Sequence, residues 1–449
     1  MNENILGTEK ISKLFIKFLI PAVISMVIAG AQTIIDGIFL GNFVGQNALA
    51  SVNIVQPFMQ IIVGFSMITS VGSLSYIGRS LGENKKEEAQ NAFKTTFIFI
   101  AAISLVVLFL GRLFNKEIAL LLGANNVLLE GVSTYIKTIS IFAPLMSLMF
   151  LFGFINRVLG KPELYLKATI LSVIVNINLD YILIKQLNLG IMGAAFATGI
   201  AFTSAFLIVI FPMLNKKNVV NIFSGKFDKS IIIPVIYNGS SEGVNSIATA
   251  ITAYMFNMAF MKIAGEAGVA AFTTINYIGQ FGTLIMFGIS DGITPIVSYN
   301  YGDKKHDRLN NTLNLALKLN LIIGILLFLI LFIFGKQLIS LFASGNSQVL
   351  NLATNGSKIY AFAFLLCGFN IIMSGYFTAI GDAKESIIIA GSRGIVFIIL
   401  GINILPMIIG TSGIWGTVPF SEFMTFTIGI YLMKKNNIIL INSKLENSL

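Results

Sequence analysis

The sequence predicts an all-α integral membrane protein with twelve membrane-spanning helices in two similar six-helix lobes. Three observations support this fold class. The 449-residue chain is 55% hydrophobic and only 11% charged, whereas soluble domains carry about 25% charged residues. Its apolar residues form runs long enough to cross a bilayer. Glycines and loop motifs also recur at a nearly constant offset between the two halves of the chain.

Each predicted span is an apolar run of roughly 20 residues or more, the length needed to cross a hydrocarbon core about 30 Å thick. In the first half the runs lie near residues 14–40, 48–74, 93–113, 131–155, 165–184 and 190–213. In the second half they lie near residues 231–261, 269–297, 311–335, 354–380, 386–409 and 411–433. A polar linker at residues 216–230 separates the halves, which predicts an N-terminal lobe at residues 1–222 and a C-terminal lobe at residues 223–449.

The two halves repeat one another. Gly82, after the second span, and Gly302, after the eighth, lie 220 residues apart, and an acidic residue and lysines follow each of them. Four further pairs keep this offset to within one residue: Gly45 and Gly265, Gly190 and Gly410, Gly193 and Gly413, and Gly160 and Gly381. Because six spans are an even number, both halves enter the membrane in the same orientation. The expected symmetry axis therefore runs along the membrane normal, with a cavity between the lobes.

The basic residues indicate the sidedness of the spans. The net charge is +10, and most of the 30 Lys and Arg residues fall in loops on one side of the predicted membrane. Cytoplasmic loops carry such an excess. We therefore expect a multi-pass protein of the plasma membrane with both termini in the cytoplasm. The positive charge is interpreted as a topology signal and not as a nucleic-acid-binding surface.

The stretch SVIVNINLDYILI, residues 172–184, places polar side chains inside a predicted span. Asn176 and Asp180 are four residues apart and share a helix face, whereas Asn178 points to another face. Asp36 in the first span is a second intramembrane carboxylate, and Gln32 lies one turn before it. Ionisable groups within a bilayer normally face the protein interior or a water-filled cavity.

We expect Asp36, Asn176, Asp180 and Thr198 of the sixth span to converge inside the N-terminal lobe. Two carboxylates close together in a low dielectric cannot both stay ionised without a large cost. The site is therefore expected to bind either a proton or a small cation such as Na⁺, and the sequence does not choose between them. The alternative is a purely structural role for these residues. In that case Asp36 caps a broken helix, and Asn176 and Asp180 only form hydrogen bonds with neighbouring helices.

The C-terminal half has its own intramembrane charges. Arg393 in the eleventh span and Glu422 in the twelfth are candidates for a buried ion pair, because pairing is the least costly way to keep both in a membrane. Glu242, early in the seventh span, has no evident cationic partner. It is a candidate site residue, and the alternative interpretation is that its side chain lies at the membrane interface. The chain has no Gly-rich phosphate loop with its lysine and only one histidine, His306. We therefore expect a transporter with no cofactor, and not an enzyme.

These residues resemble the MATE (multidrug and toxic compound extrusion) family, in particular its MepA-like branch, over nearly the whole chain. The matching parts are Pro21 with Asp36 in the first span and the segments GFINRVLGKPELYLKATILSVIVNINLDYIL, LGIMGAAFAT, GITPIVSYNYGDKKHDRL and FTAIGDAKES. The resemblance implies two six-helix lobes around a V-shaped cavity. It also implies antiport of cationic amphipathic drugs or toxins against H⁺ or Na⁺. The family's acidic site would map onto Asp36, Asn176, Asp180 and Thr198.

The resemblance also bears on the C-terminal half. Glu242 looks like a glutamate of the seventh span that binds a cation in one branch of the family. That branch also has an aspartate in the tenth span, where this chain has Asn370 in the matching region. The missing carboxylate favours cation coupling in the N-terminal lobe.

Other classes of protein stay open as alternatives. A lipid-linked oligosaccharide flippase of the same superfamily would need a cationic cavity, and Arg393 is the clearest arginine deep in a span. A major facilitator fold would show an Asp-Arg or Gly-Arg-rich loop after the second span, which GRSLGENKKEEA matches poorly. A membrane-embedded enzyme would need a catalytic cluster near the interface. The expected partners are small organic substrates and the lipid bilayer, with no nucleic acid, and the expected state is a monomer.

Overall fold

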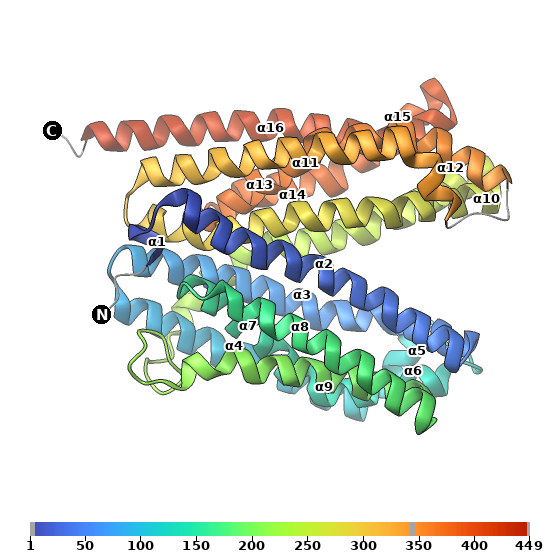
Figure 1. Ribbon diagram of the computed structural model, residues 1–449, viewed down its shortest axis with the longest axis horizontal. Coiled ribbons are helices and arrows are strands. Elements are labelled where there is room, and N and C mark those ends of the chain that lie inside the picture. Colours follow the sequence, from blue (N-terminus) through green and yellow to red (C-terminus); the bar gives the residue numbers. More distant parts are fainter. Residues whose placement is uncertain (1–4, 342–346, 447–449) are drawn as a thin grey trace. The chain divides into compact units, whose positions relative to one another are not determined.

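The computed structural model describes residues 5–341 and 347–446, and all regular secondary structure in these ranges is helical (Figure 1). The predicted all-α membrane fold is therefore confirmed. The chain forms two compact units: residues 1–243 with 295–309, and residues 244–294 with 310–449. These two units are defined by which residues pack together. The predicted boundary between residues 222 and 223 is based on the sequence repeat instead, and it stays a prediction.

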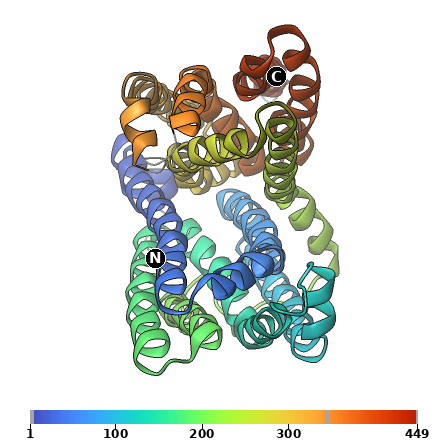
Figure 2. The same ribbon diagram turned by 90° about the vertical axis from the view of Figure 1, so that its right-hand side faces the viewer.

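The first unit contains six spans. The helices are α1 (Ile5–Thr8), α2 (Ile11–Phe43), α3 (Gln46–Gly82), α4 (Lys86–Leu113), α5 (Asn115–Leu121), α6 (Leu129–Ile139), α7 (Ala143–Val158), α8 (Pro162–Leu179) and α9 (Gly190–Ile210). A 3₁₀ turn at Ser140–Phe142 joins α6 to α7 as one span, and a π-helical segment, η2 (Asp180–Gln186), continues α8 as another. Figure 2 shows these blue-to-green helices close to end-on. Short α1 and α5 lie outside the predicted spans.

One very long helix, α10 (Ile232–Gly302), supplies two spans. Its 71 residues would extend about 106 Å as a straight helix, several times the thickness of a membrane. Gly265 interrupts it with φ 62° and ψ −153°, a conformation that glycine adopts at little cost. The seventh and eighth spans therefore meet at Gly265, where the sequence predicts a short loop.

The remaining helices belong mainly to the second unit. They are α11 (His306–Ser340), α12 (Ser347–Tyr360), α13 (Phe364–Ile380), α14 (Ala383–Gly391), the π-helical η6 (Ser392–Val396), α15 (Phe397–Ile409) and α16 (Thr411–Glu446). In the described ranges, ten helices are long and apolar enough to cross a membrane. Dividing α10 at Gly265 and adding α16 gives the twelve predicted spans. The tenth span begins at Ser347, seven residues before its predicted start.

The ends of α3 and α10 cross in close backbone contact within the first unit. A Cβ atom on Gly82 would overlap the carbonyl oxygen of Tyr299, and a Cβ atom on Gly302 would overlap that of Arg79. Gly82 and Gly302 are 220 residues apart, and so are Arg79 and Tyr299. The two contacts are therefore equivalent under the sequence repeat, because each glycine meets the residue that corresponds to the other glycine's neighbour. Only glycine permits so close an approach. The loop glycines of the repeat therefore have a packing role.

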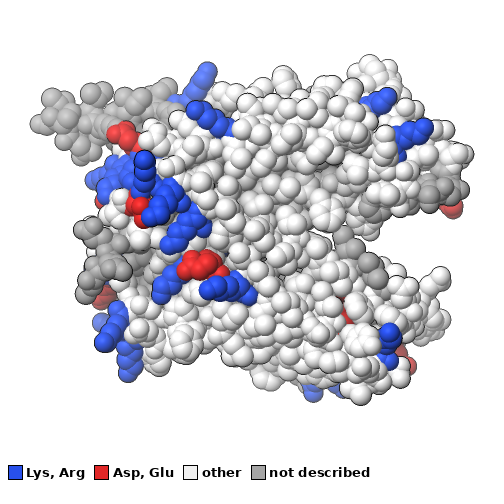
Figure 3. Space-filling model, in the orientation of Figure 1, with Lys and Arg blue, Asp and Glu red and all other residues white. Residues whose placement is uncertain are grey.

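The segment before α2 is tied to the end of α10 and the start of α11. Asn300 Nδ2 donates to the carbonyl of Leu6 at 2.9 Å, and Arg308 donates to the carbonyls of Leu6 and Glu9 at 3.0 and 2.8 Å. These donors satisfy carbonyls that a short helix leaves without partners. On the face drawn in Figure 3, Lys and Arg side chains gather near this end of the first unit.

Candidate functional site

The polar stretch of the fifth span coincides with a change of helix type. Asp180 is the first residue of η2, the π-helical continuation of α8. Such π-helical segments are rare within α-helices, and those that occur are often found at functional sites. Asp180 is 2% exposed and Asn176 is fully buried. Asn178 is exposed, and its amide donates to the carbonyl of Ile174 at 2.7 Å, so it faces away from Asn176 as the helical spacing predicts.

Asp36 and Asp180 lie together. Asp36 is in α2, which packs against α8 and η2, and the two carboxyl groups are within hydrogen-bonding range of each other. Oδ1 of Asp36 and Oδ2 of Asp180 are buried with no hydrogen-bond partner in the described part of the chain. The structure thus brings the two intramembrane carboxylates into one site, while what they bind stays a prediction.

Three other polar groups complete this site. Thr198 of α9 is 7% exposed, and its side chain is within hydrogen-bonding range of the hydroxyl of Tyr135 in α6. Tyr135 is 5% exposed and close enough to Asp36 and Asp180 to interact with their charges. Asn176, one turn before Asp180, has both amide atoms buried without hydrogen-bond partners among the described residues. Sequence reasoning missed Tyr135, because a tyrosine in an apolar run is usually a packing residue.

The chemistry of this site is that of oxygen ligands. Its two carboxyls, one amide and two hydroxyls suit a shared proton or a small hard cation, and the unpartnered amide of Asn176 is a group that such a ligand would satisfy. Gln32 lies one turn before Asp36 and is partly buried. Within residues 5–341 and 347–446, no group of three or more His, Cys, Asp or Glu residues could hold a metal ion.

The second unit holds a separate buried cluster from three helices. Arg393 of η6 donates from Nε to Oε1 of Glu422 in α16 at 2.7 Å. Asn370 of α13 donates from Nδ2 to Oε2 of the same carboxylate at 2.7 Å and to its backbone carbonyl at 2.9 Å. The structure thus forms the ion pair that the sequence proposed. It adds Asn370 as the second partner of Glu422.

Removing one member of this pair should strongly destabilise the second unit. We expect Arg393→Met to cost about 3–5 kcal/mol, because Glu422 would stay buried as an unpaired charge. The double variant Arg393→Met/Glu422→Leu should recover much of the loss. Thermal unfolding in detergent micelles measures both effects, with Lys336→Met as the control because Lys336 is exposed. An unchanged melting temperature in Arg393→Met would contradict the expectation.

Glu242 is not part of this cluster. It is partly buried in α10 and belongs to the first unit, which ends its first segment at Gly243. The structure therefore brings Asn370, Arg393 and Glu422 together. Glu242, which the sequence analysis named as a candidate with them, lies outside this cluster.

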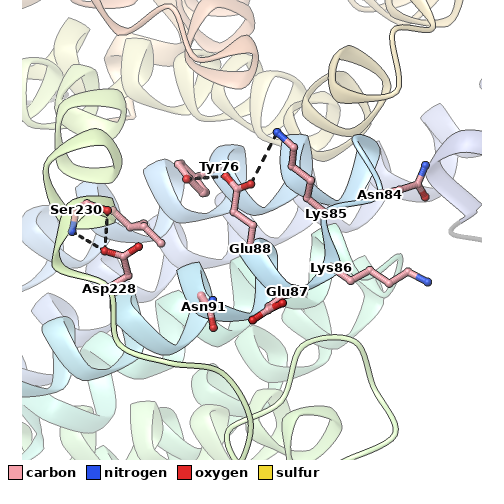
Figure 4. A pocket seen from close by; sticks show the side chains of 10 residues that line it. Tyr76, Asn84, Lys85, Lys86, Glu87, Glu88, Asn91, Asp228 and Ser230 are labelled. Carbon is pink, nitrogen blue, oxygen red and sulfur yellow. Dashed lines mark hydrogen bonds and ion pairs between the residues drawn. The ribbon is translucent and has the colours of Figure 1, made fainter.

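An open polar pocket of about 760 Å³ lies where α3, α4 and residues 228–231 meet (Figure 4). Two of the carboxylates that line it, Glu88 and Asp228, already have partners. The hydroxyl of Tyr76 donates to Glu88 at 2.8 Å, and Ser230 donates to Asp228 from its hydroxyl and its amide. The bonds from Ser230 hold the pKa of Asp228 below its usual value. This pocket is consistent with a packed loop and does not by itself point to a ligand.

Repeated apolar helices of membrane-spanning length, with carboxylates and an ion pair buried inside them, define a polytopic membrane transporter. A family description, MatE, matches residues 21–182 and 244–402. The chain therefore belongs to the MatE family. Its relatives identify it further as a MepA-like member, a transporter and not an enzyme.

The curated relatives are similar over most of the chain. The Multidrug export protein MepA of Staphylococcus aureus (strain bovine RF122 / ET3-1) is 26% identical over 414 residues, which cover 91% of this chain and 90% of the relative. The protein of the same name from Staphylococcus saprophyticus subsp. saprophyticus is 26% identical over 403 residues, which cover 89% and 87%.

Solved structures share the fold. A crystal structure of MATE in complex with MaL6 has a TM-score of 0.92 at 21% identity, covering 98% of this chain and all of that chain. An outward-facing conformation of a multidrug resistance MATE family transporter of the MOP superfamily has a TM-score of 0.91 at 21% identity, covering 98% and 99%. These matches support the predicted MATE-like arrangement of helices.

Proposed function

We propose that this chain exports cationic amphipathic organic molecules from the cell in exchange for H⁺ or Na⁺. The observation that carries the proposal is the pair Asp36 and Asp180, two carboxyls within hydrogen-bonding range of each other on membrane-spanning helices, each with one buried oxygen. Such a pair holds a proton or a small cation at lower cost than two bare charges. The relatives named as multidrug export proteins support export of several drugs as the direction and kind of transport.

The mechanism is alternating access with competition at this site. Loading the carboxyl pair with the coupling ion favours one conformation of the transporter, and emptying it favours another that binds the organic substrate. One charge that moves across 100 mV supplies about 2.3 kcal/mol, enough to drive uphill export. We place the protein in the plasma membrane as a monomer, with both termini in the cytoplasm in accordance with its basic loops.

The alternative flippase function is less well supported. A flippase of this superfamily would need a cationic cavity for pyrophosphate. Arg393 is the clearest arginine within a span, and its charge is neutralised by Glu422 at 2.7 Å. The ion pair thus removes the charge on which that alternative depended.

Transport by purified protein in liposomes tests the proposal. A fluorescent organic cation is placed on one side, and a pH gradient or a Na⁺ gradient is imposed alone. We expect one of the two gradients to drive the dye against its concentration gradient, and that gradient identifies the coupling ion. Movement that is independent of both gradients would refute ion-coupled antiport.

A further inference from the structure

The polar linker between the two halves of the chain is held against α4 by hydrogen bonds to its backbone. Gln90 donates from Nε2 to the carbonyls of Asn221 and Ser224, both at 2.8 Å, and its Oε1 accepts from the amide of Asn221 at 2.8 Å. Lys94 donates from Nζ to the carbonyl of Ile222 at 2.8 Å. Because these bonds fix the backbone of the linker, its outward side chains are held in place.

The linker buries some of its side chains and leaves large apolar ones exposed. Val220 and Asn221 are buried. Phe223 and Phe227 are 54% and 50% exposed, and Phe211, just before the linker, is 75% exposed. Single exposed apolar residues are ordinary on a protein surface. Three exposed phenylalanines in so short a segment instead indicate that this surface meets an apolar environment.

Positive charge lies beside these rings. The linker has four lysines and one acidic residue, Asp228. Nζ of Lys216 lies 5.2 Å from the centre of the Phe223 ring, so a cationic group and an apolar group are neighbours on this surface. All four lysines are exposed; they are Lys216, Lys217, Lys226 and Lys229.

The position of the linker indicates which partner meets it. The linker follows α9 and a 3₁₀ turn at Phe211–Leu214, and it precedes α10, so it joins the ends of two membrane spans. Figure 1 shows it as a loop at the end of the first unit where α1 also lies. A segment there lies at the surface of the bilayer. Lysines together with exposed aromatic rings are typical of segments that bind anionic lipid surfaces, whereas a soluble acidic partner would match the lysines and leave the rings in water.

We propose that the linker is a docking surface for anionic phospholipids. Its lysines pair with the phosphate headgroups, and Phe211, Phe223 and Phe227 insert at the boundary between headgroups and acyl chains. The bonds from Gln90 and Lys94 hold the linker in place before lipid binds, so little backbone freedom is lost on binding. This inference goes beyond the export function and does not depend on which ion drives transport.

Quenching of tryptophan fluorescence by brominated lipids tests this surface in the full-length protein in liposomes. Phe223→Trp places a reporter on the linker, and the signal of the wild type, whose single tryptophan is the buried Trp415, is subtracted. We expect brominated phosphatidylglycerol to associate with the reporter at least about fivefold more strongly than brominated phosphatidylcholine, the effect of one lysine near an anionic surface. The matched control is Phe109→Trp, because Phe109 is 59% exposed near the opposite end of α4 from Gln90. Both lipids should quench this control equally.

Removing the lysines separates their effect from that of the rings. Replacing the four linker lysines by glutamine should bring the ratio of the two lipids at Phe223→Trp close to one, and a melting curve confirms that the variant is folded. Replacing four exposed lysines on the other predicted side of the membrane removes the same charge and should leave the ratio unchanged. This control variant is Lys116→Gln/Lys185→Gln/Lys262→Gln/Lys336→Gln.

Three results would overturn the docking surface. One is a Phe223→Trp reporter that neither lipid quenches while Phe109→Trp is quenched, which would place the linker away from the bilayer. Another is equal quenching of Phe223→Trp by both lipids. The third is loss of the preference when glycerol 3-phosphate is added in solution, which would make the linker a site for soluble phosphates.

Discussion

Asp36→Asn is expected to abolish gradient-driven transport while leaving the protein folded in the membrane. The amide has nearly the shape of the carboxyl but cannot exchange a proton or balance the charge of a cation. Its partner, Asp180, would then lack the second carboxyl that lies beside it. Transport of a fluorescent cation into liposomes should fall to the level of protein-free vesicles, and Asp180→Asn should have the same effect.

Two matched variants separate coupling from general damage. Asn178→Ala changes the exposed face of α8, two residues from Asp180, and should retain transport. Glu242→Gln removes an intramembrane carboxylate outside the site and should reduce transport less than Asp36→Asn. The double variant Asp36→Asn/Asp180→Asn should be no worse than either single change, because the two groups act as a unit. Wild-type transport in both Asp36→Asn and Asp180→Asn would refute the proposed coupling site. A larger loss of transport in Glu242→Gln than in Asp36→Asn would indicate that the coupling site lies at Glu242 instead.

Gly302→Ala is expected to destabilise the protein even though it adds only one methyl group. The new Cβ atom would overlap the backbone carbonyl oxygen of Arg79, which has no side-chain freedom with which to move away. Forcing extra volume into a close-packed contact costs about 1–3 kcal/mol. A lower melting temperature in detergent measures the effect, and Gly82→Ala should reproduce it at the repeat-related contact with Tyr299.

The control for this prediction is Gly416→Ala in α16. Its Cβ atom would meet neighbouring side chains only at 4.0 Å, so the change should be neutral or slightly stabilising through better helix propensity. If Gly302→Ala and Gly82→Ala behaved like Gly416→Ala, the crossing of α3 and α10 would be looser than the structure shows.

Much of the fold follows from local sequence. The length of the apolar runs predicts the spans, because satisfying every backbone hydrogen bond inside a bilayer requires a helix. The spacing of Asn176 and Asp180 determines that they share a helix face, and the glycine offset reveals the repeat. The sequence also identifies Asp36 and Asp180 as the costly groups that need an interior partner.

Tertiary structure decided which groups meet. Tyr135 lies close enough to the two carboxylates to interact with their charges, and Asn370 is the second partner of Glu422, only because helices far apart in the chain pack together. Local periodicity gives the face of a helix but not the neighbour that this face meets. Likewise, the sequence repeat identifies Gly82 and Gly302, but only the crossing of α3 and α10 shows why neither position has room for a side chain.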